Sequence, residues 1–120
     1  MAQLLHKGKI ILNSMICKTS AFSIAVGLMF ASKKRIKDGL CLVVPSRKDE
    51  RILASVTNLF VFSSLGVLFV NLNKNVVDKA TLYPFQLIYT PKRPCKYIIE
   101  CEKSMLNKIM VGDKIKIVDS

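Results

Sequence analysis

Short apolar runs separated by turn residues dominate the chain and predict a mainly β fold. The segment from Lys9 to Cys17 is rich in isoleucine and leucine, and five apolar residues from Leu40 to Val44 end at Pro45. Runs of this length that are bounded by turn signals are typical of buried strands. The apolar segment from Leu53 to Leu72 is long enough for two strands, which we expect to separate at Ser63-Ser64.

The same pattern continues towards the end of the chain. Residues 71–75 read Asn-Leu-Asn-Lys-Asn and predict a hairpin turn, because asparagine tolerates positive φ. The strand that follows should begin at Val76 and end at Tyr83-Pro84, and a further strand is expected from Cys95 to Glu102. After the Gly112-Asp113 turn, lysine and isoleucine alternate over residues 114–117, which predicts a half-buried edge strand with its lysines in solvent.

Two segments have the features of short helices. Thr19 or Ser20 can cap a helix that continues to Met29, and residues 104–110 indicate a second. We therefore predict a compact antiparallel β domain, similar to a barrel or a sandwich, with two short helices. A chain of 120 residues fits one domain, over residues 1–120, in which residues 1–8 form an N-terminal tail.

The charge balance indicates the class of partner. The chain has 19 Lys and Arg against 8 Asp and Glu, which gives a net charge of +11 and an isoelectric point near 9.8. Such a field attracts polyanions, either nucleic acid or anionic lipid. A chance excess of solvated lysine is the alternative. We favour a polyanionic partner, because so many like charges on a small domain repel one another.

Three basic loops flank the predicted strands and supply the candidate site. If they converge at one end of the sheet, their charges can contact phosphates without reading bases. Pro91 and Pro94 bracket the third loop and should hold its charges out stiffly. Three separate solvated loops are the alternative. The candidate nucleic-acid contacts are Lys33, Lys34, Arg35, Lys37, Arg47, Lys48, Arg51, Lys92, Arg93 and Lys96.

The aromatic residues do not favour base-specific recognition. The phenylalanines of the central apolar runs should belong to the core, which leaves Tyr83, Phe85 and Tyr89 as the plausible stacking surface. There is no motif typical of an RNA-recognition sheet. Recognition of structured RNA by shape and phosphate contacts therefore fits better, as in a ribosome-associated protein or another component of a ribonucleoprotein complex.

The residues that carry catalytic chemistry are few and poorly placed. The sole histidine, His6, falls in the expected tail, and Asp49-Glu50 lies among basic residues. Glu100 and Glu102 share one strand face, where they should balance Lys96 and Lys103. No phosphate-binding glycine loop or zinc-protease motif is present. We expect no enzyme activity and no cofactor.

Four cysteines, Cys17, Cys41, Cys95 and Cys101, lack the pairwise spacing of a metal site. Each lies in or beside an apolar run, so we expect buried, reduced thiols, although the sequence leaves a disulfide open. The apolar stretch from Ala21 to Ala31 is too short to span a bilayer. The chain is therefore expected to be soluble and cytoplasmic, with no membrane partner.

Several short motifs, in a shared order, resemble one known family. They are Gly27-Leu28-Met29-Phe30, Gly39-Leu40-Cys41-Leu42-Val43, the apolar segment from Val56 to Asn71, Ile98-Ile99-Glu100, and Gly112-Asp113. Together they resemble the domain of unknown function 192 of bacteria and archaea, over about residues 9 to 118. The resemblance implies a compact, largely antiparallel β domain with small helices, and it implies no established reaction.

The chain departs from that family where the family has a polar cluster. Thr57, Ser64 and Gly66 stand where the family has polar or rigid residues, and Phe62 takes a basic position. If that cluster binds a ligand, this chain has lost it. Three hypotheses follow: a non-enzymatic protein that binds structured RNA, a small-ligand-binding domain with a pocket near Thr57, Asn58 and Ser64, or a structural subunit of a protein complex.

Overall fold

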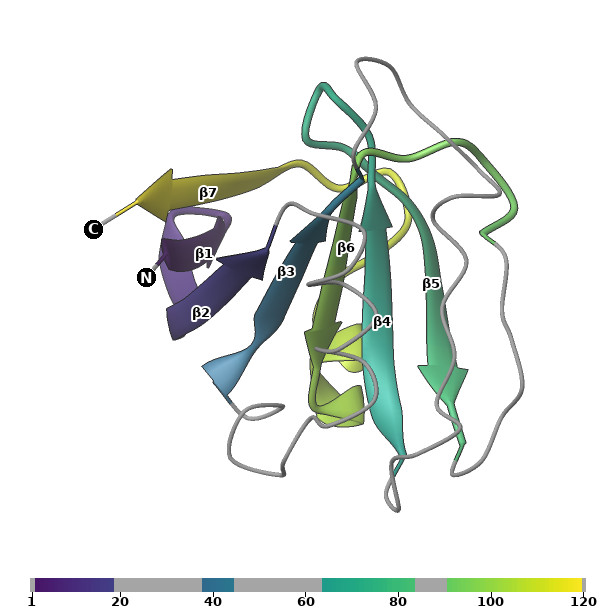
Figure 1. The fold of residues 1–120 in the computed structure, drawn as a ribbon, viewed down its shortest axis with the longest axis horizontal. Coiled ribbons are helices and arrows are strands. Elements are labelled where there is room, and N and C mark those ends of the chain that lie inside the picture. Colours follow the sequence, from purple (N-terminus) through teal and green to yellow (C-terminus); the bar gives the residue numbers. More distant parts are fainter. Residues whose placement is uncertain (1, 19–37, 45–63, 84–90, 120) are drawn as a thin grey trace.

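The computed structural model describes residues 2–18, 38–44, 64–83 and 91–119 (Figure 1). Within these ranges the protein is mainly β, as predicted, and no helix there is long and apolar enough to cross a membrane. The elements are β1 (Ala2–His6), β2 (Lys9–Lys18), β3 (Leu40–Val43), β4 (Leu65–Val70), β5 (Val76–Leu82), β6 (Tyr97–Cys101), the 3₁₀ helix η1 (Lys103–Asn107) and β7 (Ile115–Asp119).

The strands form one curled sheet in the order β5-β4-β6-β3-β2-β1-β7 (Figure 1). All neighbouring strands are antiparallel except β2 and β3, which are parallel, so the antiparallel prediction holds for every pair but one. Parallel strands need a long crossover connection. Residues 19–37, between these two strands, lie outside the described residues, and so does the helix predicted from Thr19 to Met29.

The two edge strands meet at one end of the sheet. Asn75 forms an isolated bridge with Lys114 just before β5 and β7 begin. The Ile115 N–H donates to the Lys74 carbonyl at 2.9 Å, and the Val76 N–H donates to the Asp113 carbonyl at 2.8 Å. We call this junction, residues 74–76 and 112–115, the seam. It partly closes the curled sheet and places turns that are distant in sequence side by side.

Apolar side chains cover both faces of the central strands, which explains their continuous apolar runs. On one face Leu42, Phe69 and Ile98 pack into one core cluster. On the other face Leu68 and Ile99 pack with residues of β1, β2 and η1 in a second cluster. The predicted strands at Leu40 to Val44 and Cys95 to Glu102 are confirmed as β3 and β6, and the strand that begins at Leu65 is β4.

The expected N-terminal tail is instead a strand, so this prediction was wrong. Ala2, Leu4 and His6 of β1 are buried, and the strand pairs with both β2 and β7. Lys7 and Gly8 form the tight turn between β1 and β2, with φ of 52° and 79°. A two-residue turn in this conformation matches the twist of a hairpin, and the glycine was the signal for it.

The hairpin between β4 and β5 is confirmed, with a different residue in the left-handed conformation. The Asn71 side chain accepts hydrogen bonds from the backbone N–H groups of Asn73 and Asn75, both at 3.0 Å. Positive φ falls on Lys74, at 66°, and not on an asparagine. The edge strand predicted after Gly112-Asp113 is also confirmed: it is β7, with Lys116 exposed and Ile115 buried.

The helix predicted over residues 104–110 is the shorter η1, which packs closely on β4. A Cβ atom at Gly66 would lie 3.0 Å from the Lys103 Cα, so the glycine permits this close approach of two backbone segments. The Lys79 ammonium donates to the carbonyls of Leu106 and Ile109, at 2.7 and 3.1 Å. These bonds satisfy carbonyls at the end of η1 and hold the chain that leads to the seam.

The cysteines follow the prediction with one exception. All four are reduced thiols, so no disulfide forms among them. Cys41, Cys95 and Cys101 are buried, as expected, whereas Cys17 near the end of β2 is exposed. The apolar neighbours of Cys17 suggested burial, but alternation along the strand turns this side chain to the surface.

Candidate nucleic-acid interface

The structure describes only part of the predicted basic site. The first two loops, residues 33–37 and 47–51, lie outside the described residues, as do Thr57, Asn58 and Phe62. The third loop precedes β6, and its Lys92 and Arg93 are exposed. Whether the three loops converge therefore stays a prediction.

The third loop is fixed to the body of the sheet through its backbone. The Lys92 N–H donates to Oδ2 of the buried Asp78 at 3.0 Å, and the Lys79 N–H donates to Oδ1 at 2.8 Å. The Lys96 N–H donates to the Val70 carbonyl at 2.8 Å. The Lys96 ammonium is half-buried and donates to the Val44 carbonyl at 2.6 Å. Lys96 is thus less suited to contact phosphate than the exposed Lys92 and Arg93.

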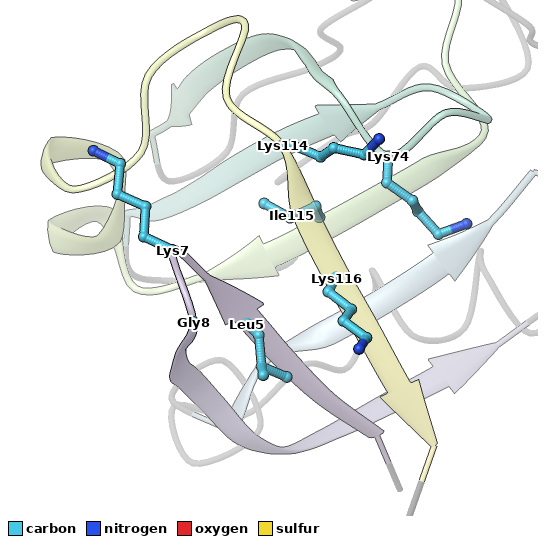
Figure 2. Close-up of a pocket in the computed structure, with 7 residues that line it drawn as sticks. All are labelled: Leu5, Lys7, Gly8, Lys74, Lys114, Ile115 and Lys116. Carbon is cyan, nitrogen blue, oxygen red and sulfur yellow. The ribbon is translucent and has the colours of Figure 1, made fainter.

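A second basic surface, which the sequence analysis did not select, lies at the seam. It surrounds a shallow pocket of about 520 Å³ between β1, β7 and the β4–β5 turn (Figure 2). Of the seven described residues that line it, four are lysines and none is acidic. The lining residues are Leu5, Lys7, Gly8, Lys74, Lys114, Ile115 and Lys116.

Backbone topology, rather than sequence proximity, gathers these lysines. The seam bridge places the β4–β5 turn beside the start of β7, so Lys74 adjoins Lys114. Strand alternation then puts Lys116 on the same side as Lys114. The Lys74 ammonium donates to the Tyr97 hydroxyl at 2.8 Å and lies 4.1 Å from the ring centroid. These contacts orient Lys74 without neutralising its charge.

A further pocket of about 520 Å³ lies on the other side of the β1–β2 turn, next to η1. Lys7 lines both pockets, and Figure 2 shows its side chain directed away from Lys116 and towards the η1 side. We call this second pocket the His6 pocket. Its lining residues are His6, Lys7, Lys9, Ile10, Ile11, Met105 and Lys108.

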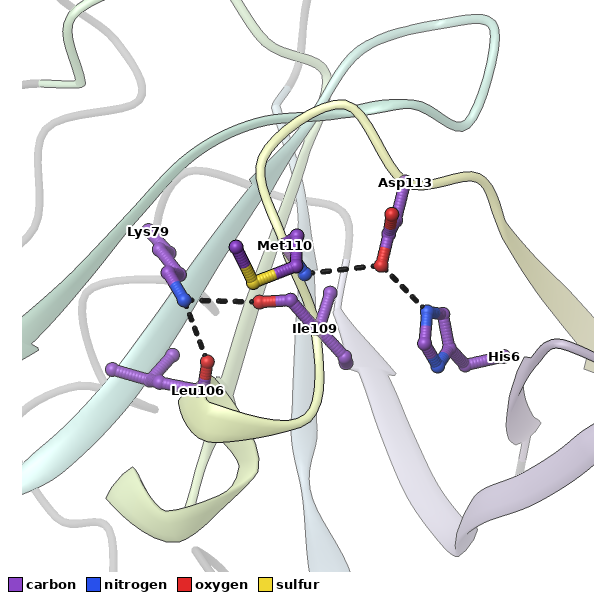
Figure 3. A network of polar contacts seen from close by, with 6 residues as sticks. All are labelled: His6, Lys79, Leu106, Ile109, Met110 and Asp113. Atoms are coloured by element: carbon purple, nitrogen blue, oxygen red, sulfur yellow. Dashed lines mark hydrogen bonds and ion pairs between the residues drawn. The ribbon is translucent and has the colours of Figure 1, made fainter.

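His6 is held in place by Asp113 of the seam (Figure 3). The His6 Nε2 lies 2.8 Å from the Asp113 Oδ2, which also accepts the Met110 N–H at 3.0 Å. The Met110 hydrogen bond and then the His6 hydrogen bond lower the pKa of Asp113 below its usual 3.8. Asp113 is therefore a carboxylate at neutral pH. Since a carboxylate only accepts, the Nε2 of His6 carries the hydrogen.

The two pockets lie on either side of the β1–β2 turn and share Lys7, and we call the lysines that line them the lysine face. Its members come from the β1–β2 turn, the β4–β5 turn, the segment after η1, and the start of β7. The signal for it in the sequence is the alternation of lysines 114 and 116, which by itself predicts only an edge strand with its lysines in solvent. The lysine face consists of Lys7, Lys9, Lys74, Lys108, Lys114 and Lys116.

Comparison with known proteins identifies the family. No family model matches the chain. A UPF0127 protein of Pyrococcus furiosus is 39% identical over 93 residues, which are 76% of this chain and 75% of the relative. A UPF0127 protein of Pyrococcus horikoshii is 39% identical over 94 residues, 77% and 76% of the two chains. The chain belongs to the UPF0127 family.

The fold of this UPF0127 protein also occurs in a solved structure. A protein of unknown function from Novosphingobium aromaticivorans superimposes with a TM-score of 0.78, over 96% of this chain and 82% of that chain. The two sequences are 17% identical, so the likeness shows a shared fold alone.

Glu100 of this UPF0127 protein does not balance surface lysines, which corrects the sequence-based prediction. Its side chain is 1% exposed, and within the described structure neither carboxylate oxygen has a hydrogen-bond partner. Desolvation by burial raises its pKa to about 8, so the carboxyl is mostly protonated at neutral pH. Desolvation, with Glu100 and Glu102 nearby, raises the pKa of Cys101 to about 12, which makes this thiol a poor nucleophile.

The His6–Asp113 pair is a histidine–carboxylate contact that the expected tail had seemed to exclude. A pair of this type can orient an imidazole for acid–base chemistry. The described residues that line the His6 pocket include no serine, threonine or cysteine to act as a nucleophile. Within the same described ranges, no three His, Cys, Asp or Glu side chains lie close enough to hold a metal ion. The positive charge of the lysine face is therefore the chemical property of this region that bears on function.

Proposed function

We propose that this protein binds structured RNA without catalysing a reaction, through phosphate contacts from the lysine face. The observation that carries the proposal is the clustering of six lysines around two adjoining pockets. Asp113 is a described carboxylate next to this surface, near enough to Lys7 for that charge to help lower its pKa. Six lysines beside this carboxylate leave a local excess of positive charge, consistent with the net charge of +11.

The form of the surface favours backbone contacts over base reading. Lysine acts as a point charge on a flexible stem, which suits phosphates in several positions. Among the described residues no aromatic side chain lines either pocket, so stacking on single-stranded bases has no platform in this part of the chain. The exposed Lys92 and Arg93 lie on the loop that enters β6, whose Lys96 N–H donates to the Val70 carbonyl at the end of β4, and can extend the contact.

The cellular location, the assembly and the wider family of the protein are part of the same proposal. A protein of this kind would act in the cytoplasm, as a ribosome-associated component or with other proteins of a ribonucleoprotein complex. The motifs that resemble the domain of unknown function 192 support its grouping with that family, as a divergent member. The proposed contact surface does not depend on the location, the assembly or the wider family.

Copurification of nucleic acid tests the proposal. The native protein, isolated at low salt, should carry RNA that nuclease treatment removes, and the stripped protein should rebind a structured RNA. A protein that is free of nucleic acid at low salt, and that fails to bind added RNA, would contradict it. A partner protein retained after nuclease treatment would favour the structural-subunit alternative.

A further inference from the structure

The His6 pocket differs from the rest of the lysine face, because it combines cations with an apolar wall. Ile10 is 54% exposed, and Ile11 and Met105 are half-buried beside it. Lys7, Lys9 and Lys108 line the same pocket. A large aliphatic side chain held in solvent beside cations suits a ligand with an anionic end and an apolar body.

His6 gives this pocket a directed polar group. The residue is 7% exposed, and its Nε2 is bound by Asp113. Figure 3 shows the second ring nitrogen, Nδ1, pointing away from Asp113, and in the described part of the chain Asp113 is the only hydrogen-bond partner of this side chain. Nδ1 accepts a hydrogen bond from a ligand when the ring is neutral and donates one when it is protonated.

We propose that the His6 pocket binds a phosphate monoester of a nucleoside. The phosphate lies among the ammonium groups of Lys7, Lys9 and Lys108, the base packs against Ile10 and Met105, and His6 Nδ1 bonds to a polar ligand atom. The volume of about 520 Å³ falls within the roughly 300–1,000 Å³ typical of small-molecule sites.

Two sources can supply this chemistry: a free nucleotide, or the terminal phosphate of an RNA strand. The apolar wall distinguishes both from a bare phosphate and from a sugar phosphate, since neither of these carries a flat apolar body. The inference goes beyond the proposed phosphate-backbone binding, because it names one pocket and a terminal group. RNA backbone binding and nucleotide binding in the His6 pocket can therefore each be refuted without refuting the other.

The chain carries its own reporter, since His6 is its sole histidine. We would record the His6 ring resonances by NMR during separate titrations with adenosine 5′-monophosphate, ribose 5-phosphate, inorganic phosphate and adenosine. The nucleotide should give a saturable shift, and it should bind at least about threefold more tightly than ribose 5-phosphate or inorganic phosphate. Equal affinity for the nucleotide and inorganic phosphate, or no saturable shift at low salt, would overturn the proposal.

Matched variants separate the pocket from general charge. Lys108→Ala should weaken nucleotide binding about three- to tenfold, because it removes a charged donor. Lys103→Ala removes an exposed lysine of η1 that does not line the pocket, and it should leave affinity unchanged. Ile10→Ser should weaken the nucleotide and spare inorganic phosphate. Equal losses in Lys108→Ala and Lys103→Ala would show unspecific charge attraction and would refute the site.

One RNA oligonucleotide, prepared with a 5′-phosphate or with a 5′-hydroxyl, distinguishes the two sources of the ligand. If the pocket takes RNA ends, a strand with a 5′-phosphate should shift the His6 resonances and bind several-fold more tightly than the 5′-hydroxyl strand. If it takes a free nucleotide, the two strands should bind with equal affinity, and the mononucleotide should displace neither strand from the protein. If RNA still binds through its backbone but no mononucleotide gives a saturable shift of the His6 resonances, this inference is refuted and the proposed function still holds.

Discussion

The Nε2 atom of His6 lies 2.8 Å from the Oδ2 atom of Asp113, and this contact joins the end of β1 to the seam before β7. The same oxygen accepts the Met110 N–H, so one carboxylate fixes both the imidazole and the turn. Both hydrogen bonds favour the ionised form and lower the pKa of Asp113. A carboxyl whose pKa is lowered by folding contributes stability above its unfolded pKa and loses it in acid.

We therefore expect Asp113→Ala to lower Tm at pH 6, with a gap to the wild type that narrows as the pH falls below 3.8, the ordinary value for this group. Thermal unfolding followed by circular dichroism from pH 2.5 to 7 measures this gap. Glu102→Ala, which removes an exposed carboxylate, serves as the control and should show no such change. A constant Asp113→Ala gap across this range would contradict the assigned role.

Glu100 should give the opposite pH dependence. The folded state keeps the carboxyl proton up to about pH 8, whereas the unfolded chain loses it near pH 4.5. The folded state thus binds more protons across this interval, so the free energy of unfolding falls as the pH rises from 4.5 to 8 and is level above it. Glu100→Gln should abolish this fall, which amounts to about 3 to 5 kcal/mol. The free energy of unfolding in urea at pH 5 and at pH 9 measures this fall. If the wild type and Glu100→Gln lose the same free energy between these two pH values, the buried, protonated carboxyl is disproved.

The contact between Gly66 and η1 predicts a graded loss of stability. Because a Cβ would lie 3.0 Å from the Lys103 Cα, Gly66→Ala must displace backbone and should cost about 1–3 kcal/mol. Gly66→Val should cost more. As a control, Gly8→Ala meets no atom within 4 Å and pays only for its positive φ of 79°. If Gly66→Ala unfolds in urea like the wild type, the close packing of η1 on β4 is wrong.

The pattern of apolar and polar residues was sufficient to predict most strands, for a physical reason. Both faces of β3, β4 and β6 are buried, and continuous apolar runs bounded by turns report this directly. Strand β1 was missed because Ala-Gln-Leu-Leu-His has no β-branched residue and only five positions. The burial of Glu100 was also missed, since strand alternation gives the side of the sheet but not what covers that side.

The candidate site was harder to predict, because tertiary closure creates it. Lys74, Lys114 and Lys116 of the lysine face come together only because the seam bridge between Asn75 and Lys114 brings the β4–β5 turn to β7. No local pattern in sequence encodes that meeting. Runs of basic residues were easier to see, and Lys92 with Arg93 is exposed as expected, but sequence could not show that the Lys96 ammonium is bound to the Val44 carbonyl.

Lys92 and Arg93 provide a test of the loop that was predicted from sequence. Replacing both by Ala should weaken all RNA sequences alike and should flatten the slope of log affinity against log salt by roughly one to two units. Folding should barely change, because both side chains are exposed while the loop backbone stays bound to Asp78. Fluorescence anisotropy with two unrelated structured RNAs measures the effect. Full affinity after both substitutions would remove this loop from the interface.

The salt dependence of RNA binding by lysine-face variants tests the central proposal most directly. If the six lysines contact about six phosphates, they should contribute about −4 to −5 to the slope of log affinity against log salt. The triple variant Lys9→Gln, Lys114→Gln, Lys116→Gln should flatten the slope by about 2 to 3 units, whereas Lys103→Gln should leave it unchanged. An unchanged slope in the triple variant, or an equal loss in Lys103→Gln, would contradict the lysine face as the RNA-binding surface.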